Sequence, residues 1–255
     1  MTSISDELRV YRGEDFRISK HIHIHQPTLG EICDYGEDKY YSMINMLTAT
    51  PQTLKAQLWD AHIDYTTITP YQLFYNMIYR IFSLESTSII FGDLDFSKFE
   101  KYQNQDGAIV LSQKITYIEG DRETADDIII DEFTYTLITD YLRGIHDIAK
   151  DEKTPANEST KMILIEDAQD ELRKSQSREH HSQLKNLISS MVNSEGFKYN
   201  HTQVWDMKIN AFMDSVKRIS RIKNAHLLLQ SGYSGFGINL RDVEQKQLNW
   251  LGELD

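Results

Sequence analysis

Three histidines alternate with isoleucines near the start of the chain. In a β-strand this alternation would place His21, His23 and His25 on one face, and imidazole is a common ligand of zinc, nickel and copper. Alternate positions on a strand lie about 7 Å apart, however, which is long for ligands of one ion. No cysteine or carboxylate accompanies the histidines at a ligand spacing. We therefore expect a solvated strand face that binds no metal.

Other groups that could do chemistry lack the partners that the chemistry needs. The glycine-rich tract at residues 232–237 is not followed by a lysine, and a helix rather than a strand precedes it, which a phosphate-binding loop does not allow. Cys33 has no nucleophile motif around it, and Asp93 and Asp95 have the spacing of acids that cap turns. The sequence therefore predicts a protein that is not an enzyme, has no catalytic residues and uses no cofactor.

Four basic residues gather on one segment of an acidic chain: Lys217, Arg218, Arg221 and Lys223. Cations near the C-terminal end of a helix are stabilised by the helix dipole, and many carboxylates are present to pair with them. We favour this intramolecular role. The alternative is a docking site for an acidic partner.

The element expected to organise the fold is a long amphipathic helix at about residues 202–229. Thr202 would be its N-cap, and the helix would end at residues 230–232. We expect its apolar stripe to be core and to pack on the N-terminal helices. The stripe recurs every three or four positions and consists of Trp205, Ile209, Phe212, Val216, Ile219 and Ile222.

Local start signals predict several shorter helices. Thr28 and Glu31 form a capping-box pattern that opens a helix to about residue 49. Pro51 and Pro70, each preceded by threonine, occupy the favoured first position of two more helices. Asp131 can cap a helix that runs to about residue 148, with the stripe Phe133, Leu137, Tyr141 and Ile145. Further helices are expected at residues 159–174 and 184–193.

The middle of the chain has strand-like rather than helical patterns. Short apolar runs at residues 87–91, 108–111, 114–118 and 128–130 predict a small sheet, with a turn at residues 104–107. The acidic stretch 119–127 is expected to be a loop. Residues 1–16 are polar and charged, so we expect an extended arm or irregular cover there.

These patterns together predict a mainly α (α+β) fold: a helical bundle with a small antiparallel sheet in the middle of the chain. A charged, proline-containing linker at residues 150–158 separates two regions. The first, residues 1–150, is helical and contains the small sheet. The second, residues 151–255, is helical, and we expect the two regions to pack together as one unit.

Composition restricts the possible partners and compartment. The formal net charge of −12 over 255 residues argues against binding to nucleic acid or to an anionic membrane. No apolar run reaches the ~18 residues of a membrane span, and no secretory signal is recognisable. A single cysteine fits a reducing compartment. We expect a cytosolic protein; the sequence carries no signal for its oligomeric state.

Two blocks of the sequence, residues 26–60 and 193–240, resemble proteins encoded in the tail modules of long-tailed phages of Gram-positive bacteria. Similar phage proteins are described as tail assembly chaperones. The resemblance covers roughly a third of the chain and includes no catalytic motif. This chain is longer than the usual family member, and its middle sheet is not part of the pattern.

The resemblance implies a non-enzymatic bacteriophage protein in the cytoplasm of the infected bacterial host. It would bind unassembled tail proteins, namely the tail tube or tape-measure protein. Two alternatives stay open: a minor virion structural protein of the tail or neck, and a host-directed phage protein such as a defence inhibitor.

A chaperone needs an apolar surface that its client can reach, and one aromatic segment is the best candidate. Its apolar residues cover more than one face of a short helix, and tyrosine rings tolerate water in the free state. The alternative is a central core helix whose hydroxyls are hydrogen-bonded. The candidate partner-binding residues are Tyr71, Phe74, Tyr75, Ile78 and Tyr79.

Overall fold

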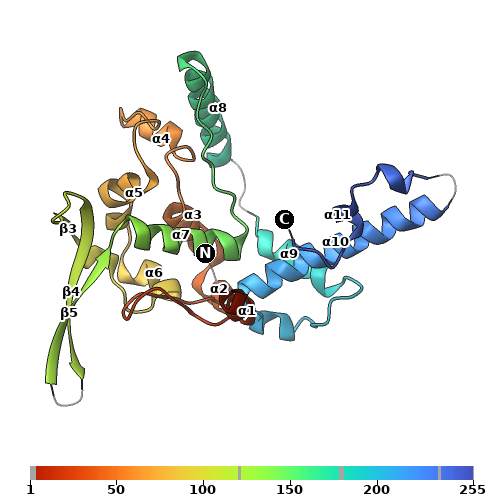
Figure 1. Cartoon of the computed structure of the whole chain (residues 1–255), viewed down its shortest axis with the longest axis horizontal. Helices are drawn as coiled ribbons and strands as arrows, with labels where there is room; N and C mark the ends of the chain where they lie inside the picture. The colour runs from red at the N-terminus through yellow and green to blue at the C-terminus, as the bar shows by residue number, and fades with distance from the viewer. Residues whose placement is uncertain (1–3, 120–121, 178–180, 235–236, 255) are drawn as a thin grey trace. The chain divides into compact units, whose positions relative to one another are not determined.

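The computed structural model (Figure 1) describes residues 4–119, 122–177, 181–234 and 237–254. The fold is mainly α with some β, as predicted. The chain divides into two compact units. The sheet unit contains Asp15–His25 and Asp34–His181, and the long-helix unit contains the described residues up to Glu14, Gln26–Cys33 and the described residues from Ser182 onward.

The sheet unit combines several helices with two small antiparallel sheets. Its strands are β1 (Phe16–Arg17), β2 (His23–Ile24), β3 (Glu100–Gln103), β4 (Ile109–Glu119) and β5 (Arg122–Ile130). Its α-helices are α3 (Glu37–Leu47), α4 (Lys55–Asp60), α5 (Pro70–Leu73), α6 (Leu84–Phe91), α7 (Glu132–His146) and α8 (Glu158–Gln176). Helix α2 (Leu29–Tyr35) begins in the long-helix unit and ends in the sheet unit.

The larger sheet has the order β3–β4–β5, and its strands differ greatly in length. Strand β3 pairs only with Ile109–Ser112 of β4, whereas β5 follows β4 from Leu111 to Glu119. Beyond Ser112 the sheet is therefore a two-stranded ribbon, which reaches past the end of β3 (Figure 1). The base of the ribbon is buried, while Ile118 near its tip is 79% exposed.

Several predicted elements take a different form in the structure. The stretch 119–127 was expected to be an acidic loop, but Glu119 ends β4 and residues 122–127 belong to β5, while residues 120–121 lie outside the described part of the chain. Residues 87–91, expected as a strand, lie in α6, whose start is fixed by a capping box between Ser83 and Ser86. The N-terminal segment, expected to be irregular, contains α1 (Ile4–Arg12).

The helix expected from Thr28 to about residue 49 is two helices. The predicted capping box is confirmed, with Thr28 Oγ1 accepting from Glu31 N at 3.1 Å and Thr28 N donating to Glu31 Oε2 at 2.6 Å. The break between α2 and α3 falls at Gly36, whose φ of 104° is in a region that side-chain-bearing residues rarely adopt.

Aromatic rings form the centre of the sheet unit. The ring of Phe96 is fully buried, and four other phenylalanine rings lie with their centroids between 5.1 and 6.2 Å from it. These rings belong to Phe74 in the π-helix after α5, Phe82 just before α6, Phe91 at the end of α6, and Phe99 after α6. This cluster fixes the segment that carries the candidate partner-binding residues.

The long-helix unit is built around α10 (Ile209–Tyr233), with α1, α9 (Gln183–Val192) and α11 (Gln245–Leu248). Helix α10 begins later than predicted, because residues 203–206 form a separate 3₁₀ turn and Thr202 does not cap it. Its first turn is instead tied to the N-terminal backbone: Ile209 N donates to Pro27 O at 2.9 Å, and Leu29 N donates to Met207 O at 3.0 Å.

The predicted stripe of α10 is buried only near the start of the helix. Ile209 and Phe212 are fully buried, and α1, a segment that was not predicted to be helical, packs against α10. The other stripe residues are half-buried rather than core: Trp205, which lies in the 3₁₀ turn before α10, and Val216, Ile219 and Ile222 within the helix. Across the described residues, every helix is too short or too polar to traverse a bilayer.

Candidate partner-binding site

Four of the five candidate partner-binding residues lie in the interior of the sheet unit. Tyr71, Phe74, Ile78 and Tyr79 are each at most 5% exposed, whereas Tyr75 is half-buried. The hydroxyl of Tyr71 donates to the carbonyl oxygens of Ile130 at 2.8 Å and Ile109 at 3.1 Å, so it is bonded as in the alternative of a core helix. Tyr75 is therefore the member of the set that a partner could touch in the folded chain.

Strong local signals place this segment. Thr69 caps α5 through a complete capping box with Gln72, and Pro70 occupies the first helical position, as predicted. After one turn the helix widens into a π-helix at Phe74–Ile78 and then narrows to a 3₁₀ turn. Such single-turn π-helices change which side chains share a face, and they are frequent at functional sites.

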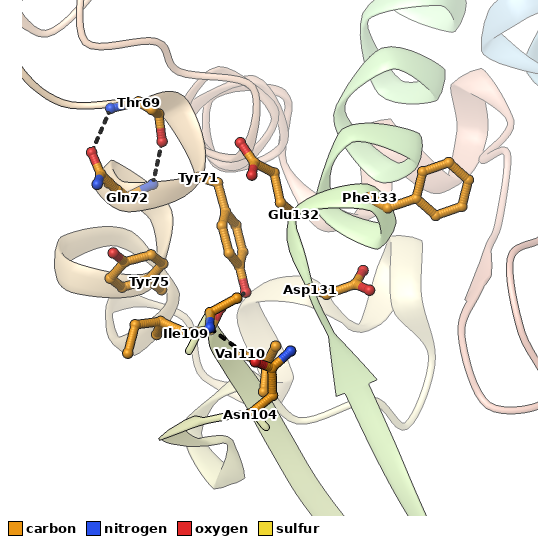
Figure 2. Close-up of a pocket in the computed structure, with 11 residues that line it drawn as sticks. Thr69, Tyr71, Gln72, Tyr75, Asn104, Ile109, Val110, Asp131, Glu132 and Phe133 are labelled. Carbon is orange, nitrogen blue, oxygen red and sulfur yellow. Dashed lines mark hydrogen bonds between the residues drawn. The ribbon is translucent and has the colours of Figure 1, made fainter. Parts of the chain in front are cut away.

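Tyr75 opens into a pocket of about 360 Å³ between the start of α5, the start of β4 and the start of α7 (Figure 2). The rings of Tyr71 and Tyr75 meet edge to face at 5.1 Å and line it from α5 and the π-helix that follows. Phe133 of α7 lines it as well and is 70% exposed. The remaining lining residues are Thr69, Gln72, Asn104, Ala108, Ile109, Val110, Asp131 and Glu132.

The apolar stripe predicted for α7 is confirmed only at Ile145, which is buried; Leu137 and Tyr141 are half-buried, and Phe133 is exposed. Asp131 does cap the helix, accepting from Thr134 N at 2.8 Å. The buried face, however, is formed by Tyr135, Ile138, Leu142, Ile145 and neighbouring residues, and it leaves Phe133 in solvent. Sequence periodicity predicted that Phe133 is buried, whereas in the structure its side chain is exposed.

Two carboxylates make the pocket electrostatically negative. Asp131 and Glu132 lie beside Tyr71, and no lysine or arginine is among the eleven residues that line the pocket. Burial raises the pKa of the Tyr71 hydroxyl above its ordinary value, and the nearby charge of Asp131 raises it further. Tyr71 is therefore a neutral floor for the pocket at physiological pH.

The three histidines near the N-terminus do not share one strand face. His21 lies in the bend before β2, and its Nε2 is 2.9 Å from Asp126 Oδ2 on the ribbon. His23 Nε2 is 2.9 Å from the carbonyl of Lys20, and His25 Nδ1 is 2.8 Å from Asp15 Oδ1. The imidazoles thus have separate partners. Among the described residues no group of three His, Cys, Asp or Glu side chains is arranged to hold a metal ion.

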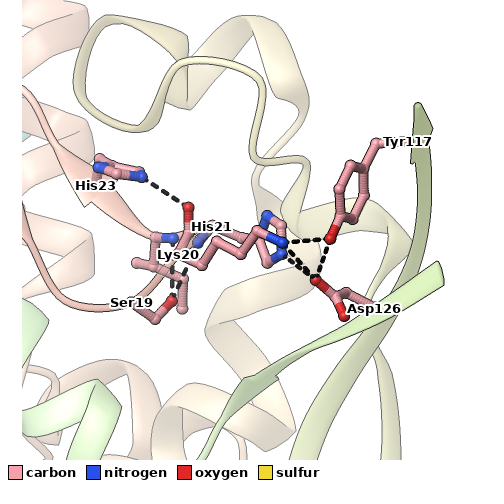
Figure 3. Close-up of polar contacts among 7 residues, drawn as sticks. Ser19, Lys20, His21, His23, Tyr117 and Asp126 are labelled. Atoms are coloured by element: carbon pink, nitrogen blue, oxygen red, sulfur yellow. Dashed lines mark hydrogen bonds and ion pairs between the residues drawn. The ribbon is translucent and has the colours of Figure 1, made fainter. Parts of the chain in front are cut away.

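Asp126 is the centre of a polar cluster that joins the β1–β2 bend to the ribbon (Figure 3). Tyr117 donates its hydroxyl proton to Asp126 Oδ2 at 2.8 Å, and Lys20 Nζ lies 3.3 Å from the same oxygen while also bonding to Tyr117. These hydrogen bonds, that from His21 first, lower the pKa of Asp126 to about 2. Lys20 is exposed and the other three residues are half-buried, and their mutual bonds join the β1–β2 bend to the ribbon.

A buried histidine in α7 was missed by the sequence reasoning. His146 Nδ1 is 2.8 Å from Leu142 O, which can only accept, so Nε2 is the acceptor for the Tyr40 hydroxyl at 2.6 Å. Burial lowers the pKa of His146 to about 4. Tyr40 is distant in sequence, so no local pattern could have indicated the pair.

The arginines of the basic patch bind backbone rather than carboxylates. Arg218 Nη1 donates to the carbonyls of Trp250 at 2.7 Å and Gly252 at 2.8 Å. Arg221 Nη2 donates to Lys246 O at 3.0 Å, and its Nη1 bonds to Glu253 O. Both arginines thus have intramolecular partners, but these are carbonyls of the C-terminal segment and not carboxylates. The helix-dipole reason was wrong, because α10 continues to Tyr233 and has no basic residue in its last turn. The glycine-rich tract 232–237 lies partly outside the described residues.

Comparison with known families gives one match. Residues 174–254 match the family described as the YomV second domain, which is phage-associated. The match covers about a third of the chain and includes α9, α10 and α11. No curated protein and no solved structure matches the chain.

The YomV second-domain match falls almost entirely in the long-helix unit, while the aromatic pocket lies in the sheet unit. It contains the second of the two blocks that resemble phage tail-module proteins. The phage association predicted from the sequence is thus supported by an independent comparison for the C-terminal part of the chain.

Proposed function

We propose that this chain is a phage tail assembly chaperone: a non-enzymatic protein that binds an unassembled tail tube or tape-measure protein in the cytoplasm of the infected host. The observation that carries the proposal is the pocket lined by the contacting rings of Tyr71 and Tyr75, of which Tyr75 is half-buried. Aromatic side chains that are reachable in the free state are the groups that most often anchor protein partners. The phage-associated match of residues 174–254 supports the biological setting.

The roles of the candidate residues divide according to burial. Tyr75 offers ring surface to a client, and its ring contacts that of the buried Tyr71; the exposed ring of Phe133 points away from both (Figure 2). Phe74, Ile78 and Tyr79 hold the segment in place from the interior. A client contact of this kind leaves the core intact, so binding does not require the sheet unit to open.

Charge and chemistry fit a binding role. The net charge of −12 keeps a chaperone and its complexes dispersed through mutual repulsion. The separate partners of His21, His23 and His25 support the non-enzymatic part of the proposal, since each imidazole serves a local hydrogen bond.

The test is co-purification with the neighbouring tail proteins, comparing two matched tyrosine variants. Tyr75→Ser removes a ring from the pocket surface, so we expect at least a tenfold loss of captured tail protein with little change in melting temperature. Tyr79→Ser removes a ring that is 1% exposed, so it should destabilise the fold by about 3–5 kcal/mol. Urea unfolding of both variants separates a binding defect from a folding defect.

Two results would contradict the proposal. Failure of the native chain to capture any tail protein would remove the chaperone role. Stoichiometric detection of the chain in purified phage particles by mass spectrometry would instead indicate the structural virion alternative.

A further inference from the structure

The ribbon of the larger sheet has an edge that no strand of the described chain covers. Strand β4 pairs with β3 only over residues 109–112, and its next residues, up to Glu119, pair with β5 alone. In an antiparallel pair only every second residue exchanges N–H···O bonds with the residue opposite, so the others point their backbone groups outward. Among the described residues, no backbone hydrogen bond from another element reaches residues 113–119. The end of the ribbon stands clear of the helices (Figure 1).

The residue types along this edge favour pairing with a further strand. Positions 115–118 are Ile, Thr, Tyr and Ile, which are β-branched or aromatic. Proteins usually blunt an unpaired edge with charges, a proline, a bulge or a covering element. Residues 113–118 contain one charge, that of Lys114, and no proline, and their pairing with β5 continues without a bulge. The outer edge of β4 is therefore able to accept a strand.

The two strands of the ribbon differ in charge. Strand β5 carries three carboxylates, those of Glu123, Asp126 and Asp127. A second β5 laid beside it would bring like charges opposite one another, which is destabilising. Residues 113–118 of β4 include no acidic residue, although the chain has a net charge of −12. Two copies of this acidic chain can therefore approach each other along β4 with little repulsion.

We propose that two copies of this chain pair through the outer edge of β4, antiparallel about a two-fold axis at Tyr117. This register sets residues 115–119 of the two copies opposite each other, with Thr116 of each facing Ile118 of the other. It leaves the positions next to Ser112 free, where Glu100 of β3 already pairs. The joined sheet has the order β5–β4–β4–β5, so its outer edges are the acidic strands and the assembly closes as a dimer.

The polar cluster at the β1–β2 bend holds the ribbon in place before it pairs. Tyr117 and Asp126 bind each other and Lys20 on one face of the ribbon (Figure 3). The exposed side chains of Thr116 and Ile118 lie on the other face, since successive residues of a strand alternate. A segment that is already held loses less conformational entropy on binding. Five paired residues are a small interface, so we expect a weak, reversible dimer.

The test compares the full native chain with two matched single variants. Thr116 and Ala125 are exposed and lie directly opposite each other, on the same face of the ribbon but on different strands. Thr116→Lys adds a positive charge at the proposed interface, where it lies near its own copy in the dimer. Ala125→Lys adds the same charge on β5. Melting temperatures verify that all three proteins are folded, and a reductant prevents cross-linking through the exposed Cys33.

Sedimentation equilibrium over a wide dilution series measures the association. We expect a monomer–dimer equilibrium of the native chain with no larger species. Salt should strengthen it, because each copy has a net charge of −12 and screening reduces the repulsion. Thr116→Lys should weaken the dimer at least fivefold, whereas Ala125→Lys should stay within twofold of the native chain.

Hydrogen exchange of the native chain, read by mass spectrometry, locates the interface without any variant. Residues 115–119 should gain protection as the protein concentration rises, and residues 123–127 should not. A chain that stays monomeric throughout the series would overturn the inference, and so would an equal loss of association in the two variants. Protection of residues 115–119 only when a tail protein is added would mean that a client strand occupies the edge instead. The inference does not rest on the proposed function, because self-pairing is measured on this chain alone.

Discussion

At the scale of single residues, the interior histidine makes the stability of the sheet unit sensitive to mild acid. His146 is neutral when folded, because its Nε2 accepts from Tyr40 and its surroundings exclude water. Its pKa is about 4 in the folded chain, against an ordinary value of 6.5. Between pH 6.5 and pH 4, His146 is protonated in the unfolded chain but not in the folded chain. The free energy of unfolding is therefore highest above pH 6.5 and decreases as the pH is lowered toward 4.

We therefore expect the free energy of unfolding to fall by about 3 kcal/mol between pH 6.5 and pH 4 on account of His146. His146→Gln should lower stability at pH 7 but flatten this pH dependence, and Tyr40→Phe should keep it. Asp64 and Asp126, whose pKa values are lowered from 3.8 to about 2, lose their stabilising contribution mostly below about pH 4.5, so titrations that stop at pH 4.5 report mainly on His146. Urea titrations at pH 7, 5.5 and 4.5 measure the slope; an unchanged slope in His146→Gln would rule out this residue as its source.

At the scale of elements, three of the predicted helix starts were correct and those at Pro51 and Thr202 were not, whereas lateral contacts were not predictable at all. Thr69, Asp131 and the Thr28–Glu31 box act within three residues of themselves, so their patterns are local and all three are present in the structure. Residues 87–91 have β-branched side chains typical of strands, yet Ser83 starts a helix through them. Residues 114–118 of the ribbon were recognised as strand-like, but residues 123–127 of β5 have no apolar alternation, and their charges therefore resembled a loop.

For the candidate site, too, the local segment was predictable from the sequence and the contacts between elements were not. The aromatic segment at residues 71–79 was recognised from its composition, and it does line the pocket through Tyr71 and Tyr75. The contributions of Asp131 and Phe133 depend on where α7 lies beside α5, which is a tertiary contact. Tyr71, Tyr75 and Tyr79 follow one another at steps of four residues, so their spacing does not distinguish the half-buried Tyr75 from the buried Tyr79. That difference, too, arises from tertiary packing.

The break between α2 and α3 gives a test with an internal control. Gly36→Ala places a Cβ on a backbone with φ 104°, with Lys39 as the nearest neighbour at an ordinary 3.8 Å, so the cost is backbone strain of about 1–3 kcal/mol. Gly144→Ala in α7 meets no atom within 4 Å and should stabilise the chain by about 0.5–1 kcal/mol. Thermal and urea unfolding of the two variants should therefore shift in opposite directions, and a stabilising Gly36→Ala would show that this break is not strained.

At the scale of the whole chain, the unit that matches the phage-associated domain is not continuous in sequence. The match begins at residue 174, but the long-helix unit also takes in α1 and Gln26–Cys33. The N-terminal backbone accepts from Ile209 and donates to Met207 where α10 begins. The matched segment therefore lacks part of its own unit.

We expect a fragment of residues 174–255 to be incompletely folded by itself. Without α1 and Gln26–Cys33, the first turn of α10 loses its backbone partners and Phe212 loses cover. Amide exchange around Ile209 and Phe212 should be fast in the fragment and should slow when a peptide of residues 1–33 is added. A peptide with the same composition in scrambled order is the control; protection in the fragment alone equal to that in the full chain would contradict the expectation.

The discontinuity also sets an order of events during translation. The segment around α1 leaves the ribosome early, but the start of α10, on which it packs, is made almost 200 residues later, which at ~5–20 residues per second is a delay of about 10–40 s. The intervening residues of the sheet unit can pair and pack during that time. The nascent N-terminal segment must meanwhile stay unaggregated with its apolar side unmatched, so a host factor that holds emerging chains would raise the yield of this protein more than that of one whose units are each continuous.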